Sequence, residues 1–139
     1  MKDLELPNYD YLVDRTVIMD SLGVEYMSRS MLWDLKKIDD PWRICFYVSI
    51  RKVKYPKLNY PVNGIYESEH DLTNLPWHGG LTYYDEYKSV SNKYLYARYG
   101  IDFQHAGDPT YSYDTGEKVL REQIDIIHQP LMKILERAK

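Results

Sequence analysis

The sequence contains a single cysteine, Cys45, among 139 residues. One cysteine excludes an internal disulfide and any multi-cysteine zinc site, and it is typical of a protein from a reducing compartment. The chain also lacks a continuous apolar run of the roughly 18 residues that a membrane span requires. Its first residues lack the apolar region of a secretory signal. We therefore expect a soluble, cytoplasmic protein with no membrane partner.

An excess of positive charge is also missing, because 18 basic side chains stand against 21 acidic ones and give a net charge of -3. This balance argues against a protein that binds duplex nucleic acid. Several common motifs are absent as well, namely Gly-x-x-x-x-Gly-Lys-Ser/Thr, Gly-x-Gly-x-x-Gly, His-Glu-x-x-His and Gly-x-Ser-x-Gly. Any active site must therefore be built from other residues.

Phenylalanine is scarce, with two residues, whereas tyrosine occurs 15 times. A tyrosine ring packs as an apolar group while its hydroxyl can bind water or a partner. Two explanations stay open at this point. The tyrosines can fill strand positions because of their β propensity, or they can line a recognition face.

The length and the 44% hydrophobic content predict one folded domain over residues 1–139. Near its start, apolar residues at spacings of three and four between positions 10 and 37 predict two short helices separated at Gly23. The β-branched segment 16–19 also suits a strand, which is the competing interpretation. Residues 43–52 alternate between apolar and more polar positions and predict a strand.

The C-terminal part predicts a helix, because apolar residues recur with helical spacing between residues 117 and 135. Pro130 lies inside this pattern and should kink or interrupt the helix near His128, which we expect on the helix surface. The fold class that follows is α+β. We expect an antiparallel sheet of at least three strands packed by the C-terminal helix, with the N-terminal helices alongside.

Two further strands are predicted at residues 80–85 and 93–103, joined by a polar connection short enough for an antiparallel hairpin. In a hairpin the start of one strand faces the end of the other. His78 would then lie opposite about Gln104. The glycine-rich segment before the first strand and the loop after the second strand would share one end of the sheet.

Two histidines and two aspartates fall at this end and form the predicted catalytic or metal-binding set: His78, Asp102, His105 and Asp108. Imidazole nitrogens and carboxylate oxygens suit zinc or manganese, and a metal-bound water could attack a phosphoryl or carbonyl centre. Without metal, an aspartate–histidine pair could act as an oriented general base. A tight turn and loop caps explain the same residues without chemistry, so the sequence leaves open whether the chain is an enzyme.

The expected ligand-binding residues lie beside this set: Gly79, Gly80, Thr82 and Tyr83. The backbone amides of the two glycines can bind an oxyanion or phosphate where a side chain would obstruct approach. A small phosphorylated ligand is therefore one expected partner.

Two segments carry a resemblance to known proteins: residues 78–83, His-Gly-Gly-Leu-Thr-Tyr, and residues 100–108, Gly-Ile-Asp-Phe-Gln-His-Ala-Gly-Asp. They resemble a group of small proteins encoded by phages and prophages, which share His-Gly-Gly-x-Thr-Tyr/Phe and Gly-Phe-Asp-x-x-His-x-Gly-Asp. Ile101 replaces the aromatic residue of the second motif. The resemblance covers about the last two thirds of the chain and implies a phage accessory or anti-defence protein acting in the cytoplasm of the host cell.

Two main hypotheses of function follow, beside a third in which the chain is a structural or assembly protein of the virion. In the first, the His/Asp pocket binds a metal or a small nucleotide-like ligand, with or without hydrolysis. In the second, the chain is a non-catalytic inhibitor whose tyrosine-rich surface and long loop, residues 53–76, dock on a host defence protein. They differ in whether the histidines or the surface tyrosines are required.

Overall fold

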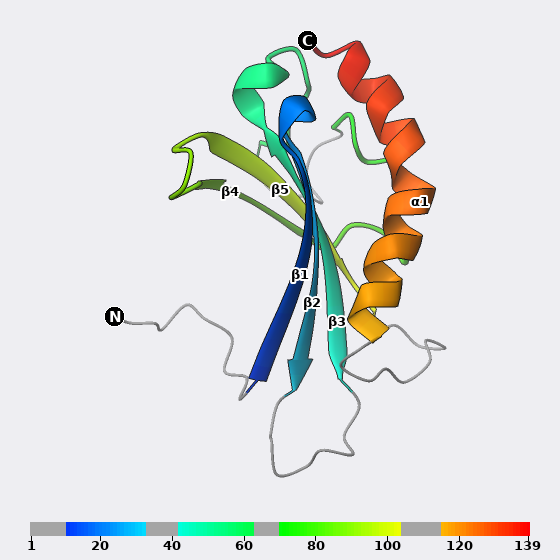
Figure 1. Ribbon diagram of the computed structural model, residues 1–139. Helices are drawn as coiled ribbons and strands as arrows, with labels where there is room; N and C mark the ends of the chain where they lie inside the picture. The colour runs from blue at the N-terminus through cyan, green and yellow to red at the C-terminus, as the bar shows by residue number, and fades with distance from the viewer. Residues whose placement is uncertain (1–10, 33–41, 63–69, 104–114) are drawn as a thin grey trace.

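The computed structural model describes residues 11–32, 42–62, 70–103 and 115–139. Within these residues, five antiparallel strands form one sheet in the spatial order β1-β2-β3-β5-β4. A long helix, α1, packs along one face of the sheet (Figure 1). The elements are β1 (Tyr11–Met19), η2 (Asp20–Leu22), β2 (Val24–Leu32), β3 (Arg43–Arg51), η3 (Lys52–Lys54), β4 (Tyr83–Lys88), β5 (Leu95–Asp102) and α1 (Thr115–Glu136). The predicted α+β class, antiparallel sheet and closing helix are confirmed.

The predicted N-terminal helices are wrong, because β1 and β2 form an antiparallel hairpin instead. Met27 and Met31 fall at a helical spacing, but they lie on the face of β2 turned away from α1. The face toward α1 carries Ser28 and Ser30, which are buried and polar and so hide the strand alternation. Gly23, expected to end a helix, has a φ of 67° in the turn between the two strands.

The strand predicted at residues 43–52 is confirmed as β3, and the predicted hairpin is confirmed as β4 and β5. β4 begins at Tyr83, three residues later than expected. Gly79 and Gly80 explain the difference, because both have a positive φ and form a turn before the strand.

The core lies between the sheet and the elements that cover it on the α1 side. β2, β3 and β5 alternate, and one set of their side chains faces α1. The buried apolar members of this set are Val24, Tyr26, Leu32, Ile44, Phe46, Val48, Ile50, Ala97, Tyr99 and Ile101. α1 contributes Val119, Leu120, Ile127, Leu131 and Leu135. No helix in the described residues has the length and apolar character to cross a membrane.

The segment between β3 and β4 covers part of this core. It was expected to be a long loop, and its described residues contain short turns rather than strands. Its large buried apolar side chains are Tyr55, Leu58, Leu72, Leu75 and Trp77. The Trp77 ring stacks on Tyr99, and its indole nitrogen donates to the carbonyl of Leu72 at 2.8 Å. The described residues of this segment therefore form part of the hydrophobic core.

α1 continues through Pro130, so the expected interruption near His128 is wrong. Proline removes the donor for the carbonyl four residues earlier, that of Ile126. Ile126 is exposed, so water can replace that donor. His128 also differs from the expectation, because its Nδ1 lies 2.7 Å from the buried hydroxyl of Tyr26.

His70 is a buried titratable group in this core, with 5% of its surface exposed. Its ring centroid lies 5.6 Å from that of Tyr99. Neither ring nitrogen of His70, nor the hydroxyl of Tyr99, has a hydrogen-bond partner among the described residues. Burial lowers the pKa of His70, against a smaller opposing effect of Asp71, and so favours the neutral ring.

We predict that the free energy of unfolding falls as the pH decreases through about 6.5 toward the lower pKa of folded His70, because the unfolded chain binds the proton more strongly. His70→Phe keeps a ring against Tyr99 and removes the titration. On acidification, the free energy of unfolding of this variant should decrease less than that of wild type. The difference should be up to about 1.4 kcal/mol per unit of difference between the folded and unfolded pKa of His70. Urea unfolding at several pH values measures this. Equal pH dependence in both proteins would contradict it.

Candidate functional site

The structure divides the described part of the predicted His/Asp site between two faces of the sheet. The His78 ring stacks on Phe103, with 4.4 Å between centroids and 10° between planes, on the α1 side. Asp102, the last residue of β5, pairs with Cys45 on the opposite face. His105 and Asp108 lie outside the described residues. Within the described chain, no three His, Cys, Asp or Glu side chains form a group that could hold a metal.

The predicted ligand-binding residues lie at the start of β4. Gly79 and Gly80 form the turn that requires positive φ, as the turn explanation expects. The amide of Thr82 donates to the carbonyl of Gly100 at 3.0 Å and continues the pairing of β4 with β5. Tyr83 follows in β4, and its side chain belongs to the face opposite α1.

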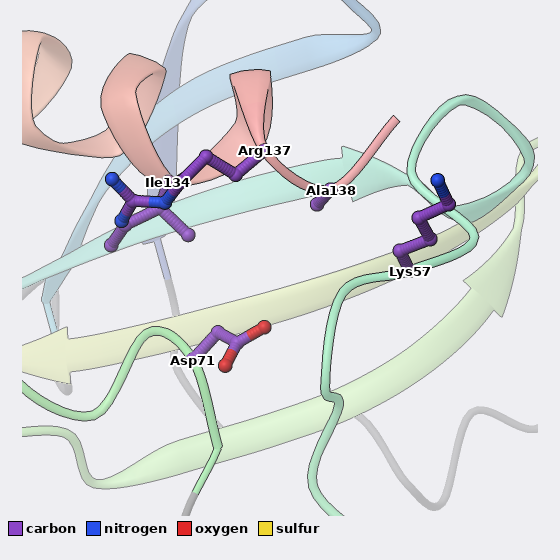
Figure 2. A pocket seen from close by; sticks show the side chains of 5 residues that line it. All are labelled: Lys57, Asp71, Ile134, Arg137 and Ala138. Carbon is purple, nitrogen blue, oxygen red and sulfur yellow. The ribbon is translucent and has the colours of Figure 1, made fainter.

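A small pocket of about 140 Å³ lies between the end of α1 and the segment that follows β3 (Figure 2). Its lining includes three charged residues, Lys57, Asp71 and Arg137. Figure 2 shows the ends of Lys57 and Arg137 pointing away from each other. Because the two cationic groups diverge, this pocket is poorly suited to clamping an anion.

The face of the sheet opposite α1, here named the open face, is the face that the helix does not cover (Figure 1). The strand registers assign its members. They are Leu12, Asp14, Thr16 and Ile18 from β1; Glu25, Met27, Arg29 and Met31 from β2; Arg43, Cys45, Tyr47, Ser49 and Arg51 from β3; Tyr83, Asp85 and Tyr87 from β4; and Tyr96, Arg98, Gly100 and Asp102 from β5.

Arg98 is at the centre of the aromatic part of the open face. It donates two hydrogen bonds to the carboxylate of Asp85, at 2.9 and 2.8 Å. Its guanidinium lies 4.6 Å from the ring centroid of Tyr87, and 5.6 and 5.8 Å from those of Tyr47 and Tyr83. Burial acts to lower the pKa of Arg98, but the bonds and charge of Asp85 outweigh it and raise the pKa. The Arg98 guanidinium therefore stays positively charged, and it contacts three aromatic rings.

Arg51 forms a second arginine site on the open face. It donates to the hydroxyl of Tyr96 at 3.3 Å and to the carboxylate of Asp20 at 2.7 Å. Its guanidinium lies 4.4 Å from the ring centroid of Tyr94, just before β5. Tyr96 stacks on Tyr87 with 5.5 Å between centroids, which joins the two arginine sites. We name the combined set the tyrosine–arginine cluster: Tyr47, Tyr83, Tyr87, Tyr94, Tyr96, Arg51 and Arg98.

Gly100 makes room for the Tyr47 ring within this cluster. A Cβ atom at position 100 would lie 2.7 Å from two carbons of that ring, which is closer than van der Waals contact allows. The ring can therefore lie over β5, where it packs edge-on against Tyr83 at 5.7 Å.

Cys45 lies next to the cluster on β3 and is half-buried. Burial raises the pKa of its thiol, and this effect is larger than that of a hydrogen bond with Tyr47, which lowers the pKa. A raised pKa keeps the thiol protonated at neutral pH. Its environment therefore favours an inert role over that of a nucleophile.

Comparisons of the chain with protein-family models, with curated proteins and with solved structures found no match.

Sequence reasoning identified the excess of tyrosine but missed the Asp85–Arg98 pair at the centre of the cluster. A signal for it was present in the predicted hairpin, since opposite charges facing each other across two strands stabilise the pair. The charge pair could be recognised only with the register of the hairpin, which states which residues face each other. This register places Asp85 opposite Arg98 and Tyr87 opposite Tyr96.

We predict that Gly100→Ala lowers the free energy of unfolding by about 1–3 kcal/mol, because the added methyl group displaces the Tyr47 ring. In a Tyr47→Ala background the same change should have a much smaller effect, because the clashing ring is gone. Urea unfolding of the two single variants and the double variant measures the coupling. Equal effects in both backgrounds would show that the clash with Tyr47 does not control this position.

Proposed function

We propose that this chain is a non-catalytic binding protein that recognises a partner protein through the tyrosine–arginine cluster of the open face. Tyrosine, methionine and arginine are enriched in protein interfaces, and a tyrosine offers both a large ring and a hydroxyl. The observation that carries the proposal is the packing of Arg98 among Tyr47, Tyr83 and Tyr87, opposite the face that α1 covers.

The cluster is preorganised for binding. The two hydrogen bonds that Arg98 donates to Asp85 fix its guanidinium plane, and the surrounding rings restrict one another by edge-on and stacked packing. Side chains ordered before binding lose less conformational entropy when a partner arrives. Two rings are open to a partner, since Tyr83 is 40% exposed and Tyr94 is 44% exposed. These two are the expected centres of the contact.

The charges on the open face favour a protein over a nucleic acid as partner. Three of its arginines are already paired with aspartates, in the pairs Arg98–Asp85, Arg51–Asp20 and Arg29–Asp14. Binding to a phosphate backbone relies on a surplus of basic groups, whereas these pairs leave a nearly neutral aromatic surface. The resemblance to phage-encoded proteins supports a protein of the bacterial host as the partner.

We predict that Tyr83→Ala and Tyr94→Ala each weaken partner binding about tenfold or more, because interface tyrosines often contribute over 1.4 kcal/mol. The immobilised protein is incubated with bacterial lysate, and retained proteins are compared between variants by mass spectrometry. Titration of the retained protein then gives the dissociation constants.

Val62→Ala serves as the matched control, because Val62 is 78% exposed and lies outside the open face. It should retain the same partner with unchanged affinity. Loss of the partner in Val62→Ala, or its full retention in both tyrosine variants, would contradict binding through the cluster.

The second candidate function is binding of zinc, manganese or a small phosphorylated ligand by His78, Asp102, His105 and Asp108. One observation favours it: β4 and β5 are antiparallel neighbours, and Tyr83, the last residue of the first motif, pairs with Gly100, the first residue of the second. The packing of His78 on Phe103, away from the face of Asp102, opposes a shared ion.

Elemental analysis of protein purified without a metal-affinity tag tests the metal form of this second function. The preferred, cluster-based function predicts that wild type and His78→Ala contain the same, substoichiometric amounts of zinc and manganese. A stoichiometric metal that is lost in His78→Ala would instead establish the His/Asp site.

A further inference from the structure

The two edges of the sheet differ in how well they are protected from pairing with another strand. Among the described strands, β1 pairs with β2 alone and β4 pairs with β5 alone. β4 has six residues, of which Asp85, Glu86 and Lys88 are charged. Short, charged edge strands resist intermolecular pairing. β1 has nine residues, its two charged ones, Asp14 and Arg15, are at the centre, and it is apolar toward both of its ends, so it is less protected than β4.

The sequence of β1 is nearly symmetric about Arg15. Leu12 and Val13 on one side correspond to Ile18 and Val17 on the other. An antiparallel pair formed by two copies of this strand, centred on Arg15, would place Leu12 opposite Ile18 and Val13 opposite Val17. All of these pairs are apolar on both sides. In a two-fold symmetric antiparallel pair, each half of the strand faces the other half of the second copy. A strand with apolar residues at matching positions in both halves therefore suits such an interface.

Arg15 at the centre would bring like charges together if its side chain extended along the edge. Its guanidinium instead lies 3.3 Å from the hydroxyl of Ser30 on β2. It also lies close to Gly116 in α1, where an added Cβ would come within 2.6 Å of it. The charge is therefore directed across β2 toward the helix and away from the edge, which reduces the repulsion between two copies.

The side chains on the open face of β1 are available for this contact. Ile18 is 61% exposed and Leu12 is 40% exposed, so both apolar side chains are accessible to a second copy. We infer that two copies of the chain associate by antiparallel pairing of their β1 edges about Arg15, which joins the two sheets into one. The backbone groups of both edges would then be hydrogen-bonded.

This arrangement has a consequence for binding. Residues that face each other in this register have the same parity, so the two open faces lie on the same side of the joined sheet. Both tyrosine–arginine clusters would then point toward the same partner surface. The inference itself is independent of the proposed function, because no residue of β1 belongs to the cluster.

A charge exchange tests the register. Sedimentation velocity should show a dimer for wild type and monomers for Leu12→Lys and Ile18→Glu, since each places a charge against an apolar side chain. An equimolar mixture of the two single variants should form dimers again, because the introduced lysine of one copy faces the introduced glutamate of the other. Val90→Lys, at a 94% exposed turn position between β4 and β5, is the control and should remain dimeric. Unchanged far-ultraviolet circular dichroism checks that each variant is folded.

Cross-linking tests the centre of the pair. In a Cys45→Ser background, copper phenanthroline should oxidise Arg15→Cys to a covalent dimer, because the Cα atoms of facing residues lie within about 5.5 Å. Thr16→Cys should cross-link far less, since its symmetry mate is offset along the strand. A monomeric wild type overturns the inference, as does a dimer that both charge variants leave intact. Preferential cross-linking of Thr16→Cys would overturn the register.

Discussion

The pairing of β3 with β5 is the constraint on which both faces of this protein depend. These strands are neighbours in the sheet but far apart in the chain, and their register sets Val48 beside Tyr99 and Tyr47 beside Gly100. A shift by one residue would exchange the buried and outward side chains of either strand. The fit of the Tyr47 ring over Gly100 favours the observed register, because other residues at that position would collide with the ring.

The two faces that result have different physical characters. The α1 side holds a closely packed apolar core, which the segment between β3 and β4 completes with residues such as Trp77. The open face instead carries ion pairs and half-exposed rings, joined through Arg98 and Arg51. The proposed function therefore assigns stability and recognition to opposite sides of one sheet. In the inferred dimer, β1 extends the sheet toward a second copy without using either side.

Sequence patterns predicted the elements in which apolar residues recur with one regular spacing. β3 followed from strict alternation, and α1 followed from an apolar stripe of helical spacing. The hairpin of β1 and β2 was missed because buried Ser28 and Ser30 interrupt the apolar pattern on its inner face. Whether His78 lies near Asp102 depends on where the pairing of β4 with β5 ends and on which way the His78 ring turns. The turn at Gly79 and Gly80 and the stacking of His78 on Phe103 determine both, and the periodicity of the sequence does not encode them.

Hydroxyl-radical footprinting of the protein, free and bound to the partner that it retains from lysate, tests the central claim most directly. Binding through the tyrosine–arginine cluster predicts that oxidation of Tyr83 and Tyr94 falls severalfold in the complex, because a buried ring is shielded from solvent. Tyr60, which lies in the segment after β3 and outside the open face, should be oxidised equally in both states. Protection of Tyr60 with Tyr83 and Tyr94 unchanged would contradict the assignment of recognition to the open face.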